Sequence, residues 1–409
     1  MPSLPRTLQP VVERVANSFP VLLLTGPRQV GKTTLLEACA GSKRRYVTLD
    51  DLEERALARH DPELFLSRHP APVIIDEVQY APELFSRIKM IADREKRDGL
   101  FWLTGSQKFH LMREVTESLA GRVAILDLLG LSQRELTGHA HTVQPFLPTK
   151  DWLNTVPAAV KKPQTVAAVY ENIWQGSLPR LRTRADVDRD IFFRGYIETY
   201  IQRDVRDLAR VGDETRFLRF VKAVAARTAQ LLNYADMARD TDIDQKTAKA
   251  WLSILEASGL VYLLPPWHSN VTKRIVKTPK MYFFDTGLCA YLTGWSSAES
   301  LEAGAMSGAI LETFMVTEIL KSYWHTGKQP RFYFYRDRDG AVVDLLIEQY
   351  NRLYPVEFKK TASPGLNAAK YFKALETLQP DVGEGAVVCL KETEVAISTT
   401  VTAIPVWYL

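Results

Sequence analysis

The sequence has few cysteines and no long apolar run. Its cysteines Cys39, Cys289 and Cys389 lie far apart and form no CxxC pair, which argues against a disulfide framework or a zinc knuckle and fits a reducing compartment. No stretch approaches the roughly 18 apolar residues that span a bilayer, and the first residues lack the apolar region of a signal peptide. We therefore expect a cytoplasmic protein without a membrane partner.

Composition favours a globular protein of several domains. The chain has 409 residues, of which 46% are hydrophobic and 24% are charged, so it has ample material for a core. At about 100–200 residues per domain, two to four domains are expected. A net charge of +4 and basic clusters at 43–45 and 273–280 give little indication of a polyanionic partner, because such clusters are usually solvated faces.

The apolar pattern divides the chain into an α/β part, a helical part and a second α/β part. Strands are predicted at 21–25, 45–49, 73–76, 100–104 and 123–128, with helices between them. This alternation predicts a parallel sheet with helices on both faces. Residues 139–168 read as a boundary or a lid-like insertion. Helices at 168–174, 185–209 and 215–229 follow, then strands at 281–284, 331–335, 342–347, 354–358 and 386–390.

A glycine-rich loop lies between the first predicted strand and the next helix. It matches the pattern G-x4-G-K-[ST] in full with Gly26, Pro27, Arg28, Gln29, Val30, Gly31, Lys32, Thr33 and Thr34. The glycines allow backbone N–H groups to turn inward as an anion nest at a helix N-terminus. Lys32 would reach the β- and γ-phosphates, and the Thr33 hydroxyl would ligate Mg²⁺. The loop therefore predicts an ATP–Mg²⁺ site.

A buried strand that ends in two carboxylates completes this site. The apolar residues 73–75 precede Asp76 and Glu77. Asp76 would hold Mg²⁺, and Glu77 would orient and activate the attacking water. An Asp-Glu ending favours ATP hydrolysis over binding alone.

Two further elements add candidates for the chemistry. The strand at 100–104 is followed by Gly105-Ser106-Gln107, where Ser106 or Gln107 could sense the γ-phosphate; the alternative is a simple turn. Arg122 stands just before the next strand and could stabilise charge in the transition state, in its own or a neighbouring subunit. A structural ion pair is the alternative for Arg122.

Residues 232–262 predict two helices with a short break. Asp244 is a suitable N-cap, and a stripe at helical spacing is predicted to be buried: Ala248, Trp251, Leu252 and Leu255. Gln245, Lys246 and Lys249 fall on the exposed side, where a recognition helix would read a DNA groove. The extended segment 260–280 could form the wing of a winged helix. The alternative is a pair of helices used for packing or as a lid.

A hairpin near the C-terminus brings together charged residues. If the turn is centred between Tyr350 and Asn351, Asp344 lies opposite Glu357, and strand periodicity puts Lys359 on the same face. Two carboxylates that hold Mg²⁺ and a lysine that acts on water are what metal-assisted phosphodiester cleavage needs. Glu312, on the predicted helix 310–320, could add a ligand. An ordinary solvated hairpin is the alternative.

Taken together, these residues resemble the prokaryotic AAA-type (STAND-like) P-loop ATPases with a C-terminal PD-(D/E)xK nuclease-like domain of unknown function. The resemblance covers nearly the whole chain through 26–34, 73–77, 103–107, 117–123, 200–205, 308–318 and the Asp344, Glu357 and Lys359 set. It implies that another strand separates the acidic strand from the loop strand, and that a winged helix follows the nucleotide domain. The nuclease motif lacks its usual proline, since Val342 and Val343 precede Asp344.

The sequence thus predicts an α/β fold with a P-loop parallel sheet, a helical and winged-helix region and a restriction-endonuclease-like domain. The expected divisions are 1–138, 139–215, 216–280 and 281–409. The expected function is Mg²⁺-dependent ATP binding and hydrolysis that switches the attached domains, with ATP and Mg²⁺ as cofactors. An ATP-regulated metal-dependent DNA nuclease and a non-enzymatic DNA-binding regulator stay open as alternatives. DNA, a protein client and further copies of the chain are the candidate partners.

Overall fold

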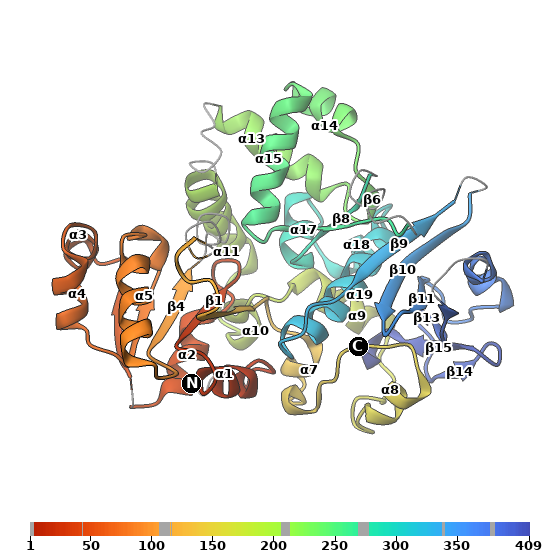
Figure 1. The fold of residues 1–409 in the computed structure, drawn as a ribbon. Helices are drawn as coiled ribbons and strands as arrows, with labels where there is room; N and C mark the ends of the chain where they lie inside the picture. The colour runs from red at the N-terminus through yellow and green to blue at the C-terminus, as the bar shows by residue number, and fades with distance from the viewer. Residues whose placement is uncertain are drawn as a thin grey trace. The chain divides into compact units, whose positions relative to one another are not determined.

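The computed structural model describes residues 4–42, 44–105, 115, 117–205, 213–268, 278–337, 340–376 and 381–409 (Figure 1). The chain forms two compact units. The first, called the N-terminal unit, comprises Met1–Leu131 with the short segments Ala257–Gly259 and Trp324–Gly327. The second unit comprises Ser132–Glu256, Leu260–Tyr323 and Lys328–Leu409. Among the described helices, none has the length and apolar character needed to cross a membrane.

The N-terminal unit is built on a parallel sheet of five strands. Its strands are β1 (Val21–Thr25), β2 (Arg45–Thr48), β3 (Val73–Asp76), β4 (Phe101–Gly105) and β5 (Val123–Asp127), in the spatial order β2-β3-β4-β1-β5. The five predicted strands are confirmed. So is the expectation that another strand, β4, separates the acidic strand β3 from the loop strand β1. Because all strands are parallel, their carboxyl ends meet at one edge of the sheet.

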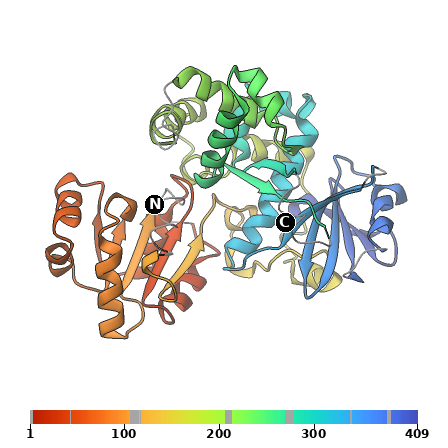
Figure 2. The same cartoon turned by 45° about the horizontal axis from the view of Figure 1, so that its top comes forward.

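Helices flank this sheet on both faces (Figures 1 and 2). They are α1 (Gln9–Ala16), α2 (Lys32–Ala40), α3 (Leu52–His60), α4 (Pro62–Arg68) and α5 (Leu84–Glu95). Strands β1, β3 and β4 are buried along their whole length, which explains why their sequences are continuously apolar rather than alternating. Leu23, Ile75 and Leu103 from the strands join Phe65 and Phe85 from α4 and α5 in one core.

The second unit begins with helices. They are α7 (Gln133–Leu136), α8 (Lys150–Thr155), α9 (Val166–Gln175), α10 (Pro179–Thr183), α11 (Arg189–Tyr196) and α13 (Glu214–Ala225). The helix predicted at 185–209 begins later, at Arg189, because the Asp188 side chain accepts the N–H of Ile191 at 2.8 Å and caps the helix there. After α11 the chain continues as a π-helical segment, Ile197–Val205. Helix α8 lies in the region predicted as a boundary or lid.

Two helices and a small antiparallel sheet follow. Helices α14 (Tyr234–Thr241) and α15 (Gln245–Ala257) flank a short break, as predicted. Asp244 caps α15 by accepting the N–H of Thr247 at 2.9 Å. The stripe predicted to be buried is confirmed at Ala248, Trp251, Leu252 and Leu255. Strands β6 (Gln230–Leu231), β7 (Val261–Leu264) and β8 (Lys280–Phe283) form the sheet in the order β6-β8-β7.

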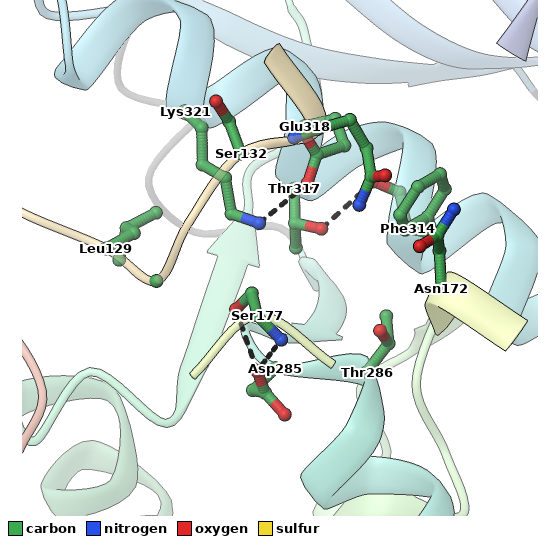
Figure 3. Close-up of polar contacts among 12 residues, drawn as sticks. Leu129, Ser132, Asn172, Ser177, Asp285, Thr286, Phe314, Thr317, Glu318 and Lys321 are labelled. Carbon is green, nitrogen blue, oxygen red and sulfur yellow. Dashed lines mark hydrogen bonds and ion pairs between the residues drawn. The ribbon is translucent and has the colours of Figure 1, made fainter. Parts of the chain in front are cut away.

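Polar contacts hold the next helices of this unit together (Figure 3). These helices are α17 (Thr286–Leu292), α18 (Ala298–Ala303) and α19 (Ser307–Trp324). The Asp285 carboxylate caps α17 and also accepts the N–H and the hydroxyl of Ser177, each at 2.7 Å. Within α19, Lys321 donates to Glu318 at 2.6 Å, and Glu318 accepts the N–H of Gln133 at 2.8 Å. The Asp285 and Glu318 carboxylates therefore join segments that are distant in the sequence.

A mixed sheet of seven strands ends the chain. Its strands are β9 (Phe332–Arg336), β10 (Val342–Gln349), β11 (Arg352–Phe358), β12 (Asp381–Val382), β13 (Gly385–Cys389), β14 (Val395–Ala396) and β15 (Val401–Pro405). They run in the order β14-β15-β13-β11-β10-β9, with β12 beside β11. Tyr350 and Asn351 have positive φ angles of 50° and 58°, as a tight two-residue hairpin turn requires.

Candidate functional site

The loop between β1 and α2 has the backbone that its glycines predict. Gly26 and Gly31 have φ angles of 147° and 91°, in a region that side-chain-bearing residues rarely adopt. A Cβ at Gly26 would also lie 2.0 Å from the carbonyl oxygen of Leu128, so only glycine fits there. The loop leads directly into α2 at Lys32, which places free backbone N–H groups and the positive end of the helix dipole beside it.

Lys32 is buried and lies on its own loop. Its Nζ donates to the carbonyl oxygens of Gly26 at 3.0 Å and Pro27 at 2.9 Å. Burial lowers the pKa of Lys32 to about 8, although Glu77 and Asp76 act in the opposite direction. The lysine must therefore turn away from these carbonyls to reach a phosphate, and the phosphate charge would favour its protonated form.

Asp76, at the end of β3, lies against the start of α2. The Thr33 hydroxyl is 3.1 and 3.2 Å from its two carboxylate oxygens. Tyr46 donates to the same carboxylate at 2.8 Å, and Thr104 donates to it from the end of β4. Among the residues that the structure describes, every side chain that hydrogen-bonds to Asp76 does so through a neutral hydroxyl. A carboxylate beside a threonine hydroxyl is the all-oxygen donor set that Mg²⁺ prefers.

Glu77 follows Asp76 with an unusual backbone. Its φ of 54° lies in the left-handed region, which turns the side chain out of the strand direction. The Glu77 N–H donates to the Thr104 hydroxyl at 3.3 Å, and its carboxylate accepts from Gln79. The strained backbone thus carries a half-buried carboxylate directly after Asp76 in the chain, a position suited to a general base.

Several residues that the sequence did not single out support this site. Arg6 is buried and donates to the carbonyl oxygens of Val30 and Leu129, both at 2.8 Å, which links the loop to the segment after β5. Tyr46 and Thr104 bind the Asp76 carboxylate as described. The neighbouring strands β2 and β4 supply them, so the parallel strand order is the signal that could have found them.

The remaining predicted residues of this unit are placed differently. Arg122 donates to both carboxylate oxygens of Asp93 on α5, with its Nη2 at 3.0 Å from Oδ2. This is the ion pair that was the alternative for Arg122, and a catalytic role in a neighbouring subunit stays a prediction. Ser106 and Gln107 lie outside the described residues.

In the second unit, two of the predicted carboxylates, Glu312 and Asp344, bind a lysine that the sequence pattern did not indicate. Lys280, on β8, donates to Glu312 on α19 at 2.9 Å and to Asp344 on β10 at 3.0 Å. Tyr282 donates to Glu312 at 2.7 Å. Burial alone would lower the pKa of Lys280, but the Glu312 and Asp344 carboxylates raise it above its ordinary value. We call Lys280, Tyr282, Glu312 and Asp344 the Lys280 cluster.

The hairpin register agrees with the prediction. Leu345 pairs with Val356 and Gln349 with Arg352, and continuing this register by one residue places Asp344 opposite Glu357. Lys359 donates to Glu357 at 2.6 Å. Burial, and then the charge of Asp344, raises the pKa of Glu357 to about 8.

The geometry adds no support for a metal here. Within the described part of the chain, no group of three or more His, Cys, Asp or Glu residues could hold a metal ion. The metal-binding role of Asp344, Glu357 and Glu312 therefore stays a prediction.

Comparisons with protein families assign three segments. Residues 18–137 match the model of an AAA domain. Residues 167–299 and 307–409 match two domains of unknown function, DUF8612 and DUF4143. The AAA match covers the whole five-stranded sheet, so this part of the chain has the P-loop ATPase fold. No nuclease family is among these matches.

Solved structures also resemble part of the chain. The Walker-type ATPase PABY2304 of Pyrococcus abyssi has a TM-score of 0.42 and 17% identity, covering 71% of this chain and 98% of that one. The RuvB Holliday junction branch migration motor of Thermotoga maritima has a TM-score of 0.29 and 15% identity, covering 63% and 86%.

Two curated mycobacterial proteins match over almost the entire sequence. They are the uncharacterized proteins Rv2008c of Mycobacterium tuberculosis and Mb2031c of Mycobacterium bovis. Each is 31% identical over 399 residues, which are 96% of this chain and 82% of the relative. The chain therefore belongs to the same family as these two mycobacterial proteins, with an AAA domain at residues 18–137.

Proposed function

We propose that the protein is a Mg²⁺-dependent ATP hydrolase. The observation that carries this proposal is the contact between the Thr33 hydroxyl and the Asp76 carboxylate at 3.1 Å, at the N-terminus of α2 and directly before Glu77. A P-loop that only bound an anion would need neither the carboxylate at this position nor the glutamate that follows it.

In this mechanism, each residue of the site has its own role. The backbone N–H groups of the loop and of the first turn of α2 would bind the phosphates. Thr33 and Asp76 would hold Mg²⁺, which when bound neutralises phosphate charge. Lys32 leaves the carbonyls of Gly26 and Pro27 and pairs with the phosphates. Glu77 accepts the proton of the attacking water.

Phosphate release from ATP tests the proposal. Lys32→Ala should abolish turnover, and Glu77→Gln should lower it on the order of 10²-fold while ATP still binds, because a general base contributes about 10²–10⁴-fold. Lys89→Ala, a lysine change on α5 of the same unit, is the matched control and should turn over ATP like the wild type. Turnover that survives Lys32→Ala would refute the proposal.

We further propose that the nucleotide state reaches α15. Ala257, the last residue of this helix, and the two residues that follow it belong to the N-terminal unit. Gly259 lies so close to the loop that a Cβ there would be 2.8 Å from Cγ of Pro27. A loop that rearranges when Lys32 leaves Gly26 and Pro27 would therefore press on the chain at the end of α15. Such a contact supports a switch in which ATP moves an attached helix.

DNA is a candidate ligand of the helices that this switch would move. Helices α14 and α15 followed by β7 and β8 have the element order of a winged helix, and Gln245, Lys246 and Lys249 on α15 are exposed. Duplex DNA should raise ATP turnover, and Lys246→Ala with Lys249→Ala should weaken DNA retention and reduce its dependence on salt. Retention that is unchanged in the double variant would favour a protein client.

A further inference from the structure

The Lys280 cluster joins three separate elements of the second unit. Lys280 comes from β8, Glu312 from α19 and Asp344 from β10. The lysine and aspartate side chains are only 11% and 12% exposed, and that of Glu312 is 17% exposed. Removing these charges from water is costly unless they compensate one another. The lysine contacts at 2.9 and 3.0 Å provide this compensation.

The lysine ammonium lies where a metal ion would have to lie. A divalent cation shared by Glu312 and Asp344 would need the facing carboxylate oxygens, Glu312 Oε1 and Asp344 Oδ1. Both of these oxygens accept from Lys280 Nζ. Glu312 Oε1 also accepts from Tyr282 at 2.7 Å, and the other Asp344 oxygen accepts the N–H of Phe358 at 3.1 Å. A metal could enter only if the lysine left and these donors reoriented.

We propose that Lys280 is a built-in counter-cation that replaces a divalent metal in this cluster and ties β8 to α19 and β10. The cluster then stabilises the joint between the small sheet and the C-terminal sheet without a metal. This inference is independent of ATP hydrolysis, and it competes with the metal-dependent nuclease that the sequence leaves open for Asp344, Glu357 and Glu312. Glu312 and Asp344 are carboxylates of the kind that bind Mg²⁺, but here the Lys280 ammonium neutralises part of their charge.

Binding of Mn²⁺ to the nucleotide-free full chain tests the replacement. All variants carry Thr33→Ala and Asp76→Asn, so that the P-loop site cannot hold the ion. While Lys280 is present, electron paramagnetic resonance should detect no bound Mn²⁺ that is lost when Asp344 is changed to Asn. Lys280→Met should gain one saturable Mn²⁺ site, and adding Asp344→Asn should remove it. The proposal fails if the chain with Lys280 already binds Mn²⁺ through Asp344, or if folded Lys280→Met gains no site.

Thermal unfolding without metal tests the charge balance. It also keeps the proposal testable if Lys280→Met is too unstable for the Mn²⁺ measurement. Loss of the ammonium leaves two buried carboxylates uncompensated, so the melting temperature should fall on the order of 10 °C. The triple variant Lys280→Met, Glu312→Gln and Asp344→Asn lacks all three charges that meet at Lys280 and should recover most of this loss. A triple variant that melts no higher than Lys280→Met would overturn the proposal.

A second buried lysine gives the matched control. Lys321 on α19 donates to one carboxylate, Glu318, at 2.6 Å (Figure 3), and both side chains are 3% exposed or less. Lys321→Met should therefore lower the melting temperature as well, but it should create no Mn²⁺ site, because Glu318 offers a single carboxylate whose second oxygen accepts the N–H of Gln133. A Mn²⁺ site that appears in Lys321→Met too would show that any uncovered carboxylate binds the ion, and the proposal would fail.

Discussion

The N-terminal unit and the second unit each contain a buried lysine near carboxylates, but the two lysines have different hydrogen-bond partners. Lys32 donates to the main-chain carbonyls of Gly26 and Pro27, and the nearby Asp76 accepts only from hydroxyls among the described residues. Lys280 instead lies between its two carboxylates. Among the described residues Asp76 has no hydrogen bond to a cation and interacts with Lys32 only through space, whereas Glu312 and Asp344 share a lysine that bonds to both.

This difference indicates which site needs an external cation. A buried carboxylate surrounded by neutral donors gains most from a metal, because the ion supplies the missing charge. A carboxylate pair that already holds an ammonium gains little, because the metal must first displace a cation that is part of the chain. The presence of acidic residues is therefore a poor guide to metal binding unless the neighbouring cations are known.

Removal of metal should separate the two sites most strongly. Chelation with EDTA should abolish ATP turnover, since several kcal/mol of stabilisation by the metal corresponds to at least about 10²-fold in rate. The thermal unfolding of the second unit should not change, because Lys280 takes the place of the ion. Phosphate release and calorimetry of the same samples measure both effects. A second unit that melts lower in EDTA, and recovers with Mg²⁺, would break the comparison.

Matched amide substitutions should act in opposite ways on the nucleotide-free protein. Asp344→Asn removes half of the counter-charge of Lys280 and should cost about 1–3 kcal/mol of stability. Asp76→Asn removes a charge that, among the described residues, is hydrogen-bonded only by hydroxyls, and the amide oxygen still accepts from Thr33 and Tyr46, so stability should stay equal or rise. Denaturant unfolding measures the difference. Equal losses in both variants would mean that the two sites do not differ in charge balance.

The parallel sheet could be predicted from the sequence because its signals are local. Continuous apolar strands, the loop motif and the Asp76-Glu77 pair each occupy a few adjacent residues, and all five strands were found. The helix start at Arg189 was missed because a strong N-cap at Asp188 outweighed the apolar pattern around it.

The balance of the C-terminal carboxylates could not be predicted, because it depends on contacts between distant parts of the chain. Lys280 is 32 residues from Glu312 and 64 residues from Asp344, and in the sequence it appears only as one of several basic residues. The hairpin register was predictable, since Tyr350 and Asn351 fix it locally. The third element, β8, is brought to this place by tertiary packing alone.

Gly259 allows the comparison to be extended to the chain segment that contacts the loop. Gly259→Ala places a Cβ 2.8 Å from Pro27 and should weaken ATP binding by about tenfold, because a displaced loop loses on the order of 1.4 kcal/mol of phosphate contact. The matched control is Gly294→Ala. Gly294 also has a positive φ, of 81°, but a Cβ there would meet nothing within 4 Å, so only backbone strain is added. Equal ATP affinity in both variants would rule out the contact as a route to α15.

The smallest expected effect concerns Tyr46, whose hydroxyl donates to Asp76 at 2.8 Å. Tyr46→Phe removes one of the neutral donors that must give way when Mg²⁺ binds to this carboxylate. The Mg²⁺ concentration for half-maximal ATP turnover should therefore fall a few-fold, in line with about 1 kcal/mol for one hydrogen bond, while the maximal rate stays close to that of the wild type. A higher requirement for Mg²⁺ would instead show that Tyr46 positions Asp76 for the metal, and that the hydroxyls around this carboxylate assist the ion rather than substitute for it.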